Sequence, residues 1–432
     1  MPLARCSFCG KAANEVNFLI PSNSKDPTSP AICDKCVDII KQGISETIRK
    51  KAANSGDALK KPHEIKAHLD QYVIGQDRAK RDVSLAIYNH YKRRQIVLQN
   101  RGELTIDVAG KPESVEVDKS NILLMGPTGS GKTHIARAVA KMLRVPFYVC
   151  DATKLTQAGY VGDDVESMLQ GLISDADHDL ERTEWGIIMI DEIDKLARKS
   201  GRGNSGYRDV TGEGVQQSLL KLIEGSLVSV PQGGIGARLD PSGARGVDCI
   251  DTKNILFIGA GSFAGIEEDV MKRLNKGYSI GFGGTDRKKF DDLDKTSIYS
   301  QVTEEDVLEF GMIPELVGRM PVLTTTLDLT EDEMVQVLTK PRNAILKQFR
   351  ALFSMENIDL QFDEGACRAI AKEAKKRPTG ARALRSIMES VLQTYAFDAP
   401  SDPTIAAIRI TADVVDGKSK AVFIKRDSQM IA

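Results

Sequence analysis

"NILLMGPTGSGKTHIARAVAKML", residues 121–143, decides the fold of this 432-residue chain. Apolar NILLM is typical of a buried strand, and HIARAVAKML has the spacing of an amphipathic helix. GPTGSGKT between them fits the pattern G-x-x-x-x-G-K-[ST], whose glycines let backbone N–H groups turn toward phosphate oxygens at a helix N-terminus. A chance glycine-rich turn is the alternative, and the flanking strand and helix argue against it. The predicted nucleotide-binding residues are Gly126, Pro127, Thr128, Gly129, Ser130, Gly131, Lys132 and Thr133.

Two side chains of this loop and two after a later strand predict the chemistry. Lys132 would meet the β- and γ-phosphates, and the Thr133 hydroxyl would meet Mg²⁺. A second apolar run, GIIMID at residues 186–191, leads into Asp191 and Glu192. Asp191 would complete the Mg²⁺ shell, and Glu192 would orient and polarise the attacking water. Acidic residues that merely end a strand are the alternative, but the two motifs together favour nucleotide hydrolysis.

The wider pattern predicts an α/β domain followed by a helical one. Four apolar runs, at residues 121–126, 147–152, 186–191 and 254–261, alternate with amphipathic stretches, which favours buried parallel strands joined by crossover helices. From residue 328 onward the pattern is mostly helical. We therefore expect a large nucleotide-binding domain at residues 62–327, with a parallel sheet and flanking helices, and a small helical domain at residues 328–432.

Composition excludes several classes of function. The chain carries 59 basic and 60 acidic residues, so no global field draws it to nucleic acid or to membranes. No apolar run approaches the roughly 20 residues that span a bilayer. The N-terminus, MPLARCSFCG, lacks the apolar core of a signal peptide. A cytoplasmic protein is the expectation.

Four of the seven cysteines lie in the first 36 residues, as Cys6-x-x-Cys9 and Cys33-x-x-Cys36. Paired cysteines at this spacing suit tetrahedral zinc–thiolate ligation, and in a reducing compartment they favour a metal over disulfides. Four protein ligands leave no open position, so the zinc would be structural. Free cysteines and an iron–sulfur cluster are the alternatives. The expected zinc-binding domain covers residues 1–50, and a small, polar, basic linker follows at residues 51–61.

Taken together, the motifs resemble the AAA+ protein unfoldases and, within them, the ClpX family of Clp protease ATPase subunits. The resemblance rests on CSFC…CDKC, YVIGQ, GPTGSGKT, ATKLTQAGYVGDDVE, IIMIDEIDK, RDVTGEGVQQSLLKLIEG, IPELVGRMP and TGARALRSI, and it covers almost the whole chain. The HslU family shares the phosphate loop and GYVG but lacks the four-cysteine domain. The resemblance implies a homohexamer that uses ATP, Mg²⁺ and Zn²⁺, takes substrate proteins directly or from adaptors, and feeds a ClpP-type peptidase.

The resemblance also assigns roles around the nucleotide. Val73, Ile74 and Gln76 would contact the adenine. Arg319 would be an arginine finger that reaches the γ-phosphate of a neighbouring subunit. Arg382 would be a sensor arginine that couples nucleotide state to the angle between domains. From the residues alone, without the resemblance, an ordinary solvated surface position is the favoured interpretation of both arginines.

Three loops complete the implied machinery. The side chains concerned are Tyr160, Val161 and Arg208, which would grip substrate in the pore, and Ile280, Gly281 and Phe282, which would dock the peptidase. A tyrosine packed into the core and a docking tip folded back on the body are the alternatives. The loop at residues 235–248 departs from the family, because IGARLDPSGARG stands where a basic Arg-Lys-His cluster is usual.

The charges of that loop cancel. Arg238 and Arg245 are offset by Asp240 and Asp248, so we expect a weaker preference for a free substrate C-terminus and more reliance on adaptors or the zinc domain. The rival interpretation is that the two arginines alone replace the missing cluster.

Two other classes of function remain open. A nucleic-acid motor would also combine zinc knuckles with a phosphate loop, but the balanced charge and the lack of a basic stripe argue against it. A zinc-binding adaptor with an inactive nucleotide site is opposed by the intact Lys132, Asp191 and Glu192.

Overall fold

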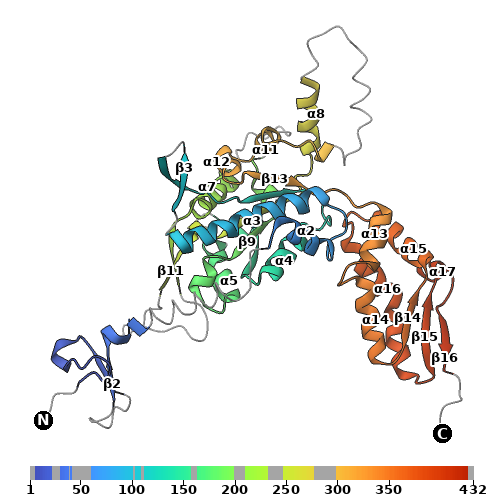
Figure 1. Ribbon diagram of the computed structural model, residues 1–432. Coiled ribbons are helices and arrows are strands. Elements are labelled where there is room, and N and C mark those ends of the chain that lie inside the picture. Colours follow the sequence, from blue (N-terminus) through green and yellow to red (C-terminus); the bar gives the residue numbers. More distant parts are fainter. Residues whose placement is uncertain are drawn as a thin grey trace. The chain divides into compact units, whose positions relative to one another are not determined.

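The computed structural model describes residues 5–21, 30–37, 39–40, 60–100, 103–108, 111–156, 163–198, 210–231, 247–276 and 298–426. The chain divides into two compact units, residues 1–60 and 61–432, whose elements are coloured along the sequence in Figure 1. Within the second unit we call residues 61–327 the nucleotide-binding part and residues 328–426 the C-terminal part. None of the helices in the described ranges has the length and apolar character needed to cross a bilayer.

The N-terminal unit is built on a short antiparallel pair of strands. Strand β1 (Leu19–Pro21) pairs with β2 (Ala31–Cys33), and the 3-10 turn η1 (Ala13–Glu15) precedes them. The buried cluster of this unit consists of three cysteine side chains, with partly buried apolar residues packed against it: Cys6, Cys33, Cys36, Val16, Leu19 and Ile32. The described residues here therefore contain little apolar core besides the cysteines.

A five-stranded parallel sheet with the order β13-β5-β12-β9-β6 forms the centre of the nucleotide-binding part. Its strands are β5 (Ile122–Met125), β6 (Phe147–Asp151), β9 (Ile187–Asp191), β12 (Leu256–Gly261) and β13 (Val322–Thr325). Four of these strands confirm the predicted apolar runs. The fifth, β13, was not predicted, because VLTT is short, half polar and at the edge of the sheet.

Helices and short hairpins surround this sheet. Helix α3 lies against β13 and β5, α4 against β9 and β12, and α5 against β6. The helices are α2 (Pro62–Asp70), α3 (Asp77–Asn100), α4 (Lys132–Leu143), α5 (Ser167–Asp175), α6 (Leu180–Thr183), α7 (Val210–Glu224), α8 (Ile266–Lys276), α11 (Glu304–Phe310) and α12 (Pro314–Gly318). Paired short strands are β3 (Glu103–Val108) with β4 (Lys111–Glu116), β7 (Leu155–Thr156) with β8 (Asp163–Asp164), and β10 (Leu227–Pro231) with β11 (Val247–Asp251).

The C-terminal part has an apolar core of its own and is not purely helical. Its helices are α13 (Glu331–Thr339), α14 (Ile345–Met355), α15 (Glu364–Lys375), α16 (Arg382–Asp398) and α17 (Ala412–Val415). A three-stranded sheet completes it, with β15 (Ile405–Ile410) between β14 (Asp359–Phe362) and β16 (Val422–Lys425). The predicted helical character is confirmed, and the small sheet, against which α14 packs, is an addition to it.

Candidate nucleotide and metal sites

The loop between β5 and α4 has a backbone that only glycine adopts easily. Gly126, Gly129 and Gly131 have φ angles of 142°, 84° and 99°, which glycine reaches at no steric cost. A Cβ at Gly126 would lie 2.2 Å from the carbonyl oxygen of Thr326. Helix α4 begins directly afterwards, at Lys132, so the positive end of its dipole faces the loop. The geometry is that of an anion-binding loop.

Lys132 lies inside the curve of this loop. Its Nζ donates hydrogen bonds to the carbonyl oxygens of Gly126 at 2.6 Å and Pro127 at 2.9 Å. Burial lowers the pKa of this lysine to about 8, while the nearby carboxylates of Asp191 and Asp194 act in the opposite direction. A partly desolvated ammonium interacts strongly with an anion, because little water screens it.

The predicted magnesium ligands meet at the end of β9. The Thr133 hydroxyl donates to Oδ2 of Asp191 at 3.1 Å. A hydroxyl and a carboxylate oxygen in contact are the ligand types that Mg²⁺ takes from proteins. Glu192 follows in the left-handed conformation, with φ of 57°, and its side chain is exposed. Its N–H donates to Oδ1 of Asp191 at 3.0 Å, which fixes the turn between the two acids.

These groups open onto a cavity of about 610 Å³. The cavity lies between the nucleotide-binding part and the C-terminal part, and both contribute to its walls. The lining residues of the nucleotide-binding part are Tyr72, Val73, Ile74, Thr128, Gly129, Ser130, Gly131, Lys132, Thr133, His134, Arg137, Asp191, Glu192, Asp194, Lys195, Gly261 and Ser262. Those of the C-terminal part are Leu329, Val337, Pro341, Asn343, Ile345, Gln348, Ala381 and Arg382. The C-terminal part lies very close to the phosphate loop, since a Cβ at Gly129 would be 2.4 Å from the Thr379 carbonyl oxygen.

One polar pair in this cavity was missed by the sequence reasoning. Asp194, only 6% exposed, accepts hydrogen bonds from the N–H of Ser262 at 3.1 Å and from its hydroxyl at 3.0 Å. Ser262 directly follows β12. The signal was available, because polar residues that follow parallel strands meet at the same edge of the sheet.

The segment between α2 and α3 contributes one wall, but only in part as predicted. Val73 and Ile74 line the cavity. Gln76 is not among the described residues that do. Its amide instead pairs with the backbone of Leu327, donating to the carbonyl at 2.7 Å and accepting from the N–H at 2.8 Å.

The two arginines lie in different places. Arg382, the first residue of α16, lines the cavity. Arg319 is absent from the described lining. It follows α12, its guanidinium pairs with Oε1 of Glu224 at 2.9 Å, and its side chain is 56% exposed. Asn121 holds the Arg319 backbone, because its side-chain amide donates to the Arg319 carbonyl at 2.9 Å.

Several predicted residues lie outside the described ranges, and the structure gives no placement for them. They are Tyr160, Val161, Arg208, Ile280, Gly281, Phe282 and residues 235–246 of the altered loop.

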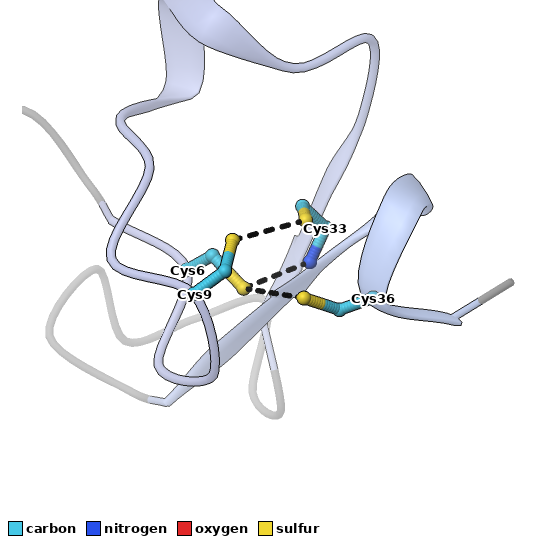
Figure 2. A group of neighbouring side chains, drawn as sticks. All are labelled: Cys6, Cys9, Cys33 and Cys36. Atoms are coloured by element: carbon cyan, nitrogen blue, oxygen red, sulfur yellow. Dashed lines mark hydrogen bonds between the residues drawn. The ribbon is translucent and has the colours of Figure 1, made fainter. Parts of the chain in front are cut away.

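The four N-terminal cysteines converge in space (Figure 2). Their sulfur atoms all lie within 4.8 Å of one another. The Sγ atoms of Cys6 and Cys36 are 3.8 Å apart, and those of Cys9 and Cys33 are 3.6 Å apart. A tetrahedron with Zn–S bonds of about 2.3 Å has edges of about 3.8 Å, so this spacing fits zinc. The Cys33 N–H also donates to Sγ of Cys6 at 3.3 Å, which favours the thiolate.

The fold and these two sites define the class, an AAA ATPase that carries a zinc finger. Residues 117–323 match the family model for the AAA domain (Cdc48 subfamily), and residues 329–411 match that for the C-terminal, D2-small domain of ClpB protein. Residues 4–46 match the ClpX C4-type zinc finger.

Full-length relatives narrow this class to one family. The chain is 46% identical over 423 residues to the ATP-dependent Clp protease ATP-binding subunit ClpX of Treponema denticola, covering 97% of this chain and 96% of the relative. It is 42% identical over 430 residues to ClpX 3 of Methylococcus capsulatus, covering 98% and 95%. The chain belongs to the ClpX family.

Proposed function

We propose that this chain is an ATP-driven protein unfoldase that assembles as a ring hexamer and passes unfolded substrates to a ClpP-type peptidase. Family membership supports this, because both relatives are named as ATP-binding subunits of an ATP-dependent Clp protease. The observation that carries the proposal is the cavity itself, which joins Lys132 and Glu192 of one part with Arg382 of the other. Such a site would couple ATP chemistry to the placement of the two parts relative to each other.

In the proposed reaction, loop N–H groups and Lys132 bind the phosphates of ATP, and Val73 and Ile74 contact the base. Thr133 and Asp191 would hold Mg²⁺, which neutralises charge on the β- and γ-phosphate oxygens when bound. Glu192 orients and polarises the attacking water. The left-handed turn at Glu192 supports this role, because it lets the carboxylate project into the cavity beside Asp191.

Arg319 supports the hexamer. A γ-phosphate in this cavity needs a further cation in the transition state, and Arg319 is half exposed and away from its own cavity. We infer that it serves the cavity of a neighbouring subunit. Arg382 would sense the phosphates from the C-terminal part, and its movement with that part would transmit hydrolysis to the pore loops.

The remaining assignments extend the same proposal. Zinc would be structural in residues 1–50, which would present substrates or adaptors, and residues 51–61 would link this domain to residues 62–327 and 328–432. Tyr160, Val161 and Arg208 would grip the substrate in the pore. Residues 280–282 would dock the peptidase, and a Phe282→Ala variant should lose degradation while it keeps ATP turnover.

One assay separates this proposal from its rivals. ATP turnover by the full chain is measured with an unfolded, tagged protein and, separately, with DNA. We expect stimulation by the unfolded protein alone, and degradation of that protein once a ClpP-type peptidase is added. Stimulation by DNA alone would indicate a nucleic-acid motor. Absence of turnover in a chain that retains zinc would indicate an adaptor with an inactive nucleotide site.

A further inference from the structure

The segment at residues 71–76 is hydrogen-bonded at its start to the C-terminal part and at its end to the last residue before that part. At its start, the carbonyl of Gln71 accepts a hydrogen bond from the N–H of Arg342 in the C-terminal part, at 2.8 Å. At its end, Gln76 makes its two bonds to the backbone of Leu327, the residue that leads into the C-terminal part. The residues that line the cavity, at positions 72–74, lie between these two attachments.

The end of the segment has an unusual backbone. Gly75 and Gln76 both have positive φ angles, of 63° and 58°. A Cβ at Gly75 would lie 2.5 Å from Oε1 of Glu333, whose carboxylate caps the start of α13 by accepting from the Thr330 N–H at 2.8 Å. A non-glycine residue persists in this conformation only where its surroundings fix it. The paired bonds to Leu327 supply that constraint for Gln76.

The other side of the segment is held by the nucleotide-binding part. Lys80 on α3 is 3% exposed, and its Nζ donates to the Val73 carbonyl at 3.3 Å and pairs with Asp70. Val73 is thereby tied to α3 as well. A displacement of Val73 and Ile74 relative to the C-terminal part would strain the bonds at Gln71 and Gln76.

We propose that Gln76 is a hinge clamp and not a nucleotide contact. It fixes Leu327 to the segment that forms the base-side wall, so occupancy of the cavity is relayed to the C-terminal part through Leu327. This inference rests on the proposed function in that ATP must occupy the cavity. A ligand shifts the placement of the C-terminal part only to the extent that it binds two such placements with different affinity. The bonds of Gln76 to Leu327 would make the position of Val73 and Ile74 depend on that placement.

The test uses Gln76→Glu in the full chain. The variant keeps the length of the side chain and the acceptor for the Leu327 N–H, but it places a carboxylate oxygen against the Leu327 carbonyl. Gln216→Glu is the matched control, because Gln216 makes the same pair of bonds within the nucleotide-binding part. It donates to the Leu196 carbonyl at 2.7 Å and accepts from the Ile313 N–H at 2.9 Å.

Hydrogen–deuterium exchange with and without Mg²⁺ and the slowly hydrolysed analogue ATPγS is the measurement. In the parent chain, we expect the analogue to slow exchange in peptides covering residues 126–133 and 326–333. In Gln76→Glu, slowing at 126–133 should persist while slowing at 326–333 falls by about fivefold or more, the lower end of ordinary coupling between sites. Gln216→Glu should keep both responses. Should Gln76→Glu fail to fold, Gln76→Met removes both bonds without adding charge.

Three results would decide against the clamp or against its premise. A parent-like response at 326–333 in the folded Gln76 variant would overturn it. Loss of ATPγS affinity together with the response at 126–133 would also overturn it, because Gln76 would then contact the nucleotide directly. A parent chain with no response at 126–133 would instead refute nucleotide binding, and with it the proposed function.

Discussion

The N-terminal unit and the nucleotide-binding part depend on their ligands in opposite ways. The first has a buried cluster of three cysteines with few apolar neighbours among its described residues. The second buries every residue of β5 and β12, and Leu123, Met125 and Phe257 of these strands belong to one large apolar core. A chain of about 40 residues seldom stabilises itself without a metal or a disulfide. We therefore expect the N-terminal unit to fold only with zinc bound, whereas the nucleotide-binding part should fold without its nucleotide.

Removal of zinc should therefore show the largest effect in the molecule. Chelation under reducing, anaerobic conditions should unfold residues 5–40 and leave the melting of residues 61–426 unchanged, since zinc binding supplies about 10–16 kcal/mol in comparable peptides. Metal analysis should find about one zinc per chain. Exchange measurements before and after chelation report each region separately.

Two exposed cysteines give the matched pair for this experiment. Cys9 and Cys249 are both exposed, but only Cys9 belongs to the four-sulfur cluster. Cys9→Ser should lose zinc, and Cys249→Ser should retain it. If both variants retained zinc, the four-cysteine cluster would not be the metal site.

In the nucleotide-binding part, by contrast, a lost ligand contact should change chemistry while the fold survives. Glu192→Gln should reduce ATP turnover by about 10²- to 10⁴-fold, the usual worth of a general base, with ATP still bound. Lys132→Ala removes a phosphate contact and should weaken ATP binding itself. Equilibrium binding and single-turnover hydrolysis separate the two effects. Turnover near the parent rate in Glu192→Gln would withdraw its assignment.

The same contrast explains what the sequence could predict. The phosphate loop, the two acids and the cysteine pairs are local patterns in the sequence. The structure places the loop and the acids on one cavity and brings the four cysteines together. Arg382 came from the family resemblance, and the structure brings it to the cavity. The bonds of Gln76 to Leu327 and of Arg319 to Glu224 join residues far apart in the chain, so no periodicity encodes them. Strands β13 to β16 were missed because four to six residues at a sheet edge or beside long helices leave little pattern.

A smaller effect should distinguish the glycines that shape the loop. Gly126→Ala would place a Cβ 2.2 Å from a backbone oxygen, whereas a Cβ at Gly131 meets nothing within 4 Å. Both positions have positive φ, which costs alanine about 1–3 kcal/mol. Gly131→Ala should show that cost alone, and Gly126→Ala more, as a lower denaturation midpoint. Equal destabilisation would mean that the contact with Thr326 relaxes freely.

The smallest effect concerns pH. Burial lowers the pKa of Lys132 to about 8 from an ordinary value of 10.5. Phosphate binds the charged form, so ATP affinity should be level below pH 8 and fall above it, approaching about tenfold per pH unit. Nucleotide titrations between about pH 7 and pH 9.5 at fixed ionic strength measure this slope. Lys132→Arg stays charged throughout and should flatten it.

The free energy of unfolding should also depend on the Lys132 proton, but it should rise with pH where ATP affinity falls. The folded chain releases the proton of Lys132 near pH 8, while the unfolded chain keeps it up to about pH 10.4. Between these values the unfolded state binds more protons, so the free energy of unfolding rises with pH. The difference between the parent and Lys132→Met isolates this group from other buried lysines. If ATP binding became tighter above pH 8, or if the free energy of unfolding fell there, the titrating group would not be Lys132.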